Sequence, residues 1–129
     1  MGAMQERPQA VLPGEYDAAT IARQMVDVAV DKKASDVTLM DIQEVTTLAD
    51  YFVIATGMSD RQIRAISSAI QERMDEIDVR RLRVEGLPTD GWVLLDYGQV
   101  VVHIFGPAER AYYDLERRWK EAPTLLKIQ

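Results

Sequence analysis

The chain has 129 residues, of which 47% are hydrophobic and 28% are charged, and its formal net charge is −6. This length and composition predict one globular domain that buries its own core. The absence of cysteine excludes disulfides and thiolate metal sites and favours a reducing compartment. No apolar run reaches the roughly 20 residues of a transmembrane helix, so we expect a cytoplasmic protein without a membrane partner. The acidic balance argues against binding DNA or RNA with the whole surface.

The two ends of the chain lack hydrophobic periodicity. Residues 1–15 predict a disordered tail, and its start, Met1-Gly2-Ala3, resembles the remnant of an expression tag before a native Met4. Residues 16–122 are expected to form the domain, and residues 123–129 a short C-terminal tail. No repeat, low-complexity segment or long linker divides the chain.

A helix is predicted over residues 16–33, with Asp17 placed to cap it. Its apolar residues recur at helical spacing, at Ala18, Ile21, Ala22, Met25, Val26 and Ala29. Residues 36–42 follow with the alternation and β-branched content of a strand.

Residues 51–57 form a nearly continuous apolar run that ends in glycine. Such a run is typical of a strand buried on both faces, at the centre of a sheet. Ser59 and Gln62 then match a capping box, with Ser at the cap and Gln three residues on. The helix behind this box carries apolar residues spaced by three and four, at Ile63, Ile66, Ile70, Met74 and Ile77.

The second half of the chain predicts three more strands. Residues 80–85 are short and charged, which places them at a sheet edge. Residues 86–91 are rich in turn formers. Residues 92–105 are typical of two strands joined by a tight turn at Gly98, where glycine supplies the backbone freedom.

The last helix is predicted to open at Gly106 and Pro107, with proline at its first position, and to end at Pro123. Its expected apolar stripe consists of Ala108, Tyr112, Leu115 and Trp119. The whole order predicts an α/β fold in a single domain, with a mixed five-stranded sheet flanked by three helices.

The predicted hairpin has bulky apolar residues on both faces, whereas a sheet covered on one face alternates apolar with polar residues. Either the hairpin lies in the middle of a covered sheet, or one of its faces is kept for a partner. Trp92, Tyr97 and the only histidine, His103, are residue types that favour a partner. Asp96 directly precedes the turn and is placed to cap it with its side chain.

The sequence offers little material for catalysis. A single histidine and no cysteine cannot form a metal cluster, and no serine lies in a nucleophile elbow. The turn before Ser59 lacks the lysine and the glycine spacing of a phosphate-binding loop. No two carboxylates are spaced by two on one strand, as a two-metal site would favour. We therefore expect a protein that is not an enzyme, with no cofactor, catalytic or metal site.

Three blocks of the sequence resemble hallmarks of the Iojap family, the bacterial ribosomal silencing factors. The blocks are residues 50–62 (DYFVIATGMSDRQ), residues 91–98 (GWVLLDYG) followed by 101–105 (VVHIF), and residues 112–119 (YYDLERRW). They occur in family order, and the similarity covers residues 16–119. Three linked motifs of this length make the resemblance specific.

This resemblance implies a function that spacing alone does not show. Family members bind the large ribosomal subunit through its ribosomal protein number fourteen and block a bridge to the small subunit. The subunits then fail to associate, and translation is repressed when nutrients are scarce. The family fold resembles nucleotidyltransferases without their catalytic acid pair, and some members are dimers, so a homodimer is a further expectation.

Carried over to this chain, the partner-binding surface centres on the predicted hairpin. Its residues are expected to be Trp92, Val93, Leu95, Asp96, Tyr97 and His103. Alternation along the strand puts Trp92, Leu94 and Asp96 on one face and Val93, Leu95 and Tyr97 on the other. Only one set can face the partner, apart from residues at the turn.

Three other functions stay open at this point. An RNA-binding module would use Arg80, Arg81, Arg83 and the basic last helix, although we expect RNA contact to be incidental. A dimerisation domain would use the aromatic face for a second copy. A residual nucleotidyltransferase would need Mg²⁺, for which the sequence gives few ligands.

Overall fold

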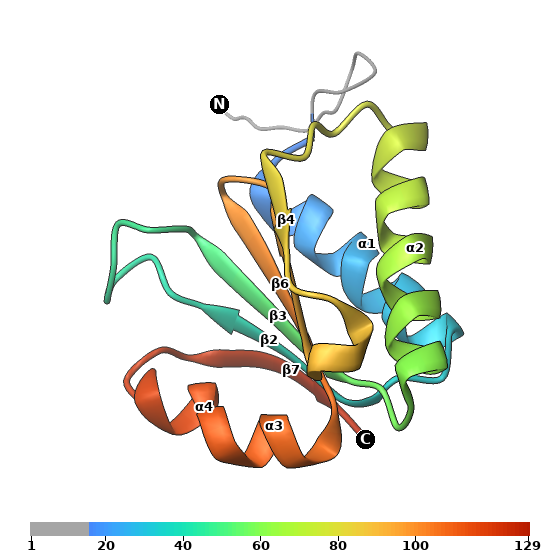
Figure 1. The fold of residues 1–129 in the computed structure, drawn as a ribbon. Coiled ribbons are helices and arrows are strands. Elements are labelled where there is room, and N and C mark those ends of the chain that lie inside the picture. The colour runs from blue at the N-terminus through green and yellow to red at the C-terminus, as the bar shows by residue number, and fades with distance from the viewer. Residues whose placement is uncertain (1–15) are drawn as a thin grey trace, which may run out of the picture.

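The computed structural model describes residues 16–129, and the expected tail with its tag remnant, residues 1–15, lies outside them. The elements in chain order are α1 (Ala18–Asp31), β2 (Ser35–Asp41), β3 (Tyr51–Thr56), α2 (Asp60–Glu76), β4 (Arg83–Glu85), the short 3₁₀ helix η1 (Pro88–Asp90), β5 (Trp92–Asp96), β6 (Val100–Phe105), α3 (Pro107–Tyr113), α4 (Leu115–Arg118) and β7 (Thr124–Ile128). Figure 1 shows α1 and α2 on one side of the sheet and α3 and α4 on the other. The predicted α/β class is confirmed.

The sheet has six strands in the order β4-β5-β6-β3-β2-β7. Only β3 and β6 pair in parallel, so the sheet is mixed, as predicted. The expected number of five was wrong, because the segment expected as a C-terminal tail forms β7 along β2, with Leu126 opposite Leu39. Without β7, the outer backbone groups of β2 would lack ladder partners, and buried groups of this kind are nearly always paired.

The face under α1 and α2 forms the larger core. All six apolar residues predicted for the first helix are buried there, together with Ile63, Ile66, Ile70 and Met74 of α2. Asp17 caps α1 by accepting the backbone N–H of Thr20 at 2.8 Å, and Ser59 caps α2 by accepting that of Gln62 at 3.1 Å. Both caps confirm the sequence prediction, because they satisfy N–H groups that a helix start leaves free.

The other face is covered by the chain that follows β6. The single last helix predicted from Pro107 was wrong, because Asp114 takes a left-handed φ of 48° and separates α3 from α4. The expected stripe therefore does not lie on one face: Leu115 is buried, while Tyr112 is 81% exposed. Aspartate tolerates this backbone region better than most residues, and the change of direction lets α4 return to the sheet.

The strands that carry the candidate site were placed correctly. β3 lies between β6 and β2 in the sheet and is buried along most of its length, and β4 is an exposed edge strand. β5 and β6 form the predicted hairpin, in which Gly98 has a φ of 85°. Asp96 caps this turn, since its Oδ1 accepts the backbone N–H of Gly98 at 2.8 Å. None of the helices described between residues 16 and 129 has the length and hydropathy that crossing a membrane requires.

Candidate protein-docking surface

The alternation of β5 divides the predicted binding residues between the two faces of the sheet. Val93 and Leu95 are 2% and 0% exposed, and both belong to the core under α1 and α2. Tyr97 joins the same core, where burial raises the pKa of its hydroxyl. These three side chains hold the hairpin to the helices, and a docking partner would not reach them without opening the core.

Trp92, Leu94 and Asp96 are half-buried and lie on the opposite face. In the register of the hairpin, they stand opposite Phe105, His103 and Val101 of β6. Asp96 is engaged at the turn, because its second oxygen also lies 3.2 Å from Nε of Arg83. Trp92 and Leu94 are thus the members of this row that remain free to present apolar surface.

Trp92 is the centre of an aromatic cluster formed by β5, β6 and α3. Its ring centroid lies 4.3 Å from that of Tyr113 and 5.1 Å from that of Phe105. Its indole N–H donates to Nδ1 of His103 at 3.2 Å. Tyr112 continues the cluster outward with an edge-on contact to Tyr113. The rings therefore run from the interior of the sheet face to the solvent.

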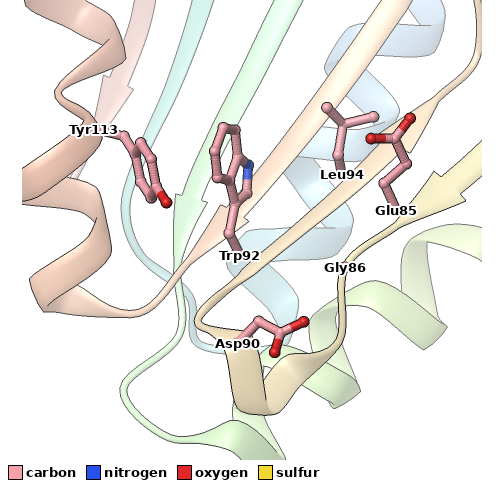
Figure 2. A pocket seen from close by; sticks show the side chains of 6 residues that line it. All are labelled: Glu85, Gly86, Asp90, Trp92, Leu94 and Tyr113. Atoms are coloured by element: carbon pink, nitrogen blue, oxygen red, sulfur yellow. The ribbon is translucent and has the colours of Figure 1, made fainter.

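A pocket of about 290 Å³ opens beside Trp92 (Figure 2). Its lining residues are Glu85, Gly86, Asp90, Trp92, Leu94 and Tyr113. The indole of Trp92 stands between Tyr113 and Leu94. The carboxylate of Glu85 lies beside Leu94, and that of Asp90 lies below Trp92 in this view. The surface therefore combines flat aromatic walls with an acidic rim, which suits an apolar or a cationic side chain.

The loop before β5 fixes this rim. Gly86 has a φ of 84°, and a Cβ added there would clash with the backbone oxygen of Trp92. Glycine is required at this position because both the close approach and the backbone conformation exclude a side chain. Asp90 closes the loop by accepting the backbone N–H of Leu87 at 3.0 Å.

Arg110 anchors α3 to the sheet and so holds Tyr113 in place. Its guanidinium donates to the hydroxyls of Thr56 on β3 at 2.9 Å and of Thr38 on β2 at 3.1 Å. It also pairs with Glu116 on α4, with Nε 3.1 Å from Oε2. One side chain thus ties α3 to two strands and bridges the break before α4.

Sequence reasoning missed five lining residues of this pocket: Glu85, Gly86, Asp90, Leu94 and Tyr113. Two features of the sequence could have identified some of these lining residues. Strand alternation put Leu94 on the face of Trp92, and Tyr113 belongs to the third hallmark block. Glu85 ends β4 opposite Leu94, and Asp90 ends η1. The sequence predicted an edge strand over residues 80–85 and only a turn-rich composition over residues 86–91, which does not place either carboxylate.

Two alternatives raised by the sequence, a metal site and an RNA-binding surface, can be compared with the described residues. Among residues 16–129, no three His, Cys, Asp or Glu side chains gather in a way that could hold a metal ion. The arginines considered for RNA are partly engaged: Arg83 pairs with Glu85 and Asp96, and Arg81 donates to Gln71.

Comparison with known proteins identifies the family. Residues 15–129 match the family described as "Ribosomal silencing factor during starvation". A relative from Bacillus subtilis, named ribosomal silencing factor RsfS, is 43% identical over 72% of this chain and 79% of its own length. A mouse relative, named mitochondrial assembly of ribosomal large subunit protein 1, is 28% identical over 74% of this chain and 43% of its own.

A crystal structure of a Chromobacterium violaceum protein has the same fold, with a TM-score of 0.79. The two sequences are 34% identical, and the matched region covers 81% of this chain and 88% of the solved chain. A silencing factor is a regulator of the ribosome and not an enzyme. The chain belongs to the family of ribosomal silencing factors, as the three sequence blocks predicted.

Proposed function

We propose that this protein binds the large ribosomal subunit through ribosomal protein number fourteen and thereby prevents the small subunit from joining. The docking surface is the aromatic face of β5 with its acidic rim: Trp92, Leu94, Tyr113, Glu85 and Asp90. The observation that carries the proposal is the half-exposed Trp92–Tyr113 pair beside an open pocket. Large aromatic side chains of this kind supply most of the free energy at protein interfaces.

Two further points support the partner. The name of the mouse relative connects a family member with the large ribosomal subunit. The net charge of −6 and the carboxylates of Glu85 and Asp90 complement the basic surface expected of a ribosomal protein. Complementary charge accelerates encounter, while burial of the rings holds the complex together.

The mechanism that we propose is steric. A docked domain occupies space that the small subunit needs, so no bond is formed or broken. An interface of about 800 Å² per partner is enough for specific binding. The surface around Trp92 would supply its centre, and the remaining contacts would come from the rim.

Truncation of Trp92 tests this function directly. Trp92→Ala should weaken binding to isolated ribosomal protein number fourteen by about 2 kcal/mol, roughly thirtyfold. The matched control is Val30→Ala, which truncates an exposed apolar side chain on α1, on the opposite side of the sheet. A pull-down measures binding, and sedimentation of mixed ribosomal subunits measures joining.

The two assays separate the parts of the proposal. Equal binding by the parent and Trp92→Ala would show that the docking surface is elsewhere. Subunits that join at their usual rate with the parent protein bound would contradict the steric mechanism. Concentration-dependent light scattering that disappears in Trp92→Ala would assign the surface to a second copy of the chain instead.

A further inference from the structure

The buried end of the aromatic cluster is a histidine that the docking surface does not expose. His103 lies on β6 opposite Leu94 and is only 5% exposed. The ring of Phe105 stacks on it at a centroid distance of 6.1 Å, and the ring of Phe52 meets it edge-on at 4.8 Å. These contacts fix the plane of the imidazole from two sides. A partner on the surface therefore would not touch His103, although the sequence placed it in the binding set.

The imidazole has one hydrogen-bonding task in this structure. Burial lowers the pKa of His103 to about 4, so the ring is neutral at neutral pH. A neutral imidazole has one accepting nitrogen and one N–H. Because Nδ1 accepts the indole N–H of Trp92, the proton lies on Nε2, which is buried without a hydrogen-bond partner. A buried unpaired N–H is costly. The Nδ1 side carries the hydrogen bond that His103 makes with its side chain in this structure.

The hydrogen bond to His103 distinguishes the two orientations that the indole of Trp92 can adopt about its side-chain bond. Rotation about the bond that joins an aromatic ring to its side chain has two broad minima, related by a half turn. The observed orientation directs the indole N–H toward Nδ1 of His103, whereas a half turn would direct it away. In Figure 2 the indole nitrogen lies on the Leu94 side of the ring, away from Tyr113.

We propose that His103 is a positioning residue for the docking surface: its Nδ1 selects one orientation of the Trp92 indole and holds it as a wall of the pocket. The consequence for binding rests on the proposed function given above, whereas the consequence for Trp92 does not. A ring held in its bound orientation loses less conformational freedom when a partner docks, which favours the complex.

Three substitutions separate the acceptor from the packing. His103→Phe keeps an aromatic ring and removes the acceptor, while His103→Asn keeps an acceptor oxygen near the place of Nδ1. His103→Gln moves the acceptor to the place of Nε2 and serves as a second acceptor-loss variant if phenylalanine does not fit. The readout is the indole N–H resonance of Trp92, with Trp119, the only other tryptophan, as internal reference.

We expect the Trp92 resonance to shift and broaden in His103→Phe and His103→Gln, and to stay near its parent position in His103→Asn. Nitrogen-15 shifts of the parent imidazole should place the proton on Nε2. An unchanged Trp92 resonance in both acceptor-loss variants, or a proton on Nδ1, would overturn the proposal.

Binding to ribosomal protein number fourteen provides the second arm. His103→Phe should weaken binding about fivefold, as expected for one net hydrogen bond. The same change in a Trp92→Phe background should have no further effect, because the donor is already absent. An equal loss in both backgrounds would overturn the positioning role. A parent protein that does not bind would contradict the proposed function, while the resonances would still decide whether His103 orients Trp92.

Discussion

The two faces of the sheet differ in composition and in how completely they are covered. Under α1 and α2, aliphatic side chains pack against each other, and Ile66, Ile70 and Leu95 are completely buried. Under α3 and α4, aliphatic residues such as Ile42, Ile54 and Leu115 share the space with aromatic rings and an arginine network. The cover ends at Trp92, which contacts Tyr113 of α3 and stays half-buried. The first face closes a core, whereas the second ends in an open pocket.

This difference shows how one short strand serves two purposes. Neighbouring residues of β5 point to opposite faces, so the same five residues contribute both to folding and to the proposed recognition. The aliphatic face gains from complete burial. The aromatic face keeps flat ring surface in contact with solvent, so a partner can pack against it.

The largest effect should come from the two adjacent leucines of β5. Leu95→Ala should reduce the free energy of unfolding by about 3 kcal/mol, since it leaves a cavity in a fully buried site. Leu94→Ala should change stability much less and weaken partner binding instead. Chemical denaturation and a pull-down of folded protein measure the two quantities. Equal stability losses in both variants would contradict the division of β5 into two faces.

The pH dependence of stability tests the aromatic face. The unfolded chain protonates His103 near pH 6.5, whereas burial lowers its pKa to about 4 in the folded protein. Between these values the unfolded chain binds more protons, so the free energy of unfolding should fall as pH falls, by about 3 kcal/mol in total. This contribution of His103 to the free energy of unfolding should be fully present above pH 6.5 and lost by pH 4.

Denaturation of the parent and of His103→Phe across this range isolates the effect. Carboxylates titrate in both proteins, so the difference between the two curves belongs to His103. If the difference in free energy of unfolding between the two proteins stays constant from pH 7 to pH 4, the folded protein does not lower the pKa of His103.

The arginine network should link stability and binding. Arg110→Ala removes a half-buried guanidinium and leaves Thr38, Thr56 and Glu116 without their partner. We expect a loss of about 2 kcal/mol in stability, with weaker docking because Tyr113 loses its anchor. Arg117→Ala, an exposed arginine on α4, is the matched control. If both variants bind alike, α3 does not depend on the network.

The smallest effect should come from the rim. Glu85→Gln removes one charge beside the pocket while keeping the shape of the side chain. Association with a basic partner should slow about twofold and depend less on salt, with little change in dissociation. Stopped-flow measurements at two ionic strengths check this prediction. An association rate that salt does not affect in the parent protein would remove the electrostatic contribution.

Local patterns determined most of the fold in advance. The spacing of isoleucines predicted α2, the continuous apolar run predicted the central strand β3, and Gly98 marked the turn of the hairpin. The misses share a cause. β7 is short and gains its stability from β2, far away in sequence, and the left-handed Asp114 interrupts a segment whose composition is compatible with a continuous helix. Neither the pairing of β7 nor the break at Asp114 can be recognised from a short stretch of sequence.

The docking surface shows the same limit. Strand alternation by itself separated Trp92, Leu94 and Asp96 from Val93, Leu95 and Tyr97, because successive side chains of a strand point to opposite faces. The three hallmark blocks by themselves identified the family. Only the tertiary structure decided which row is covered, since burial depends on where helices from other parts of the chain pack. It also brought His103 and Tyr113 to Trp92, because they come from a neighbouring strand and from a helix that Arg110 ties to the sheet.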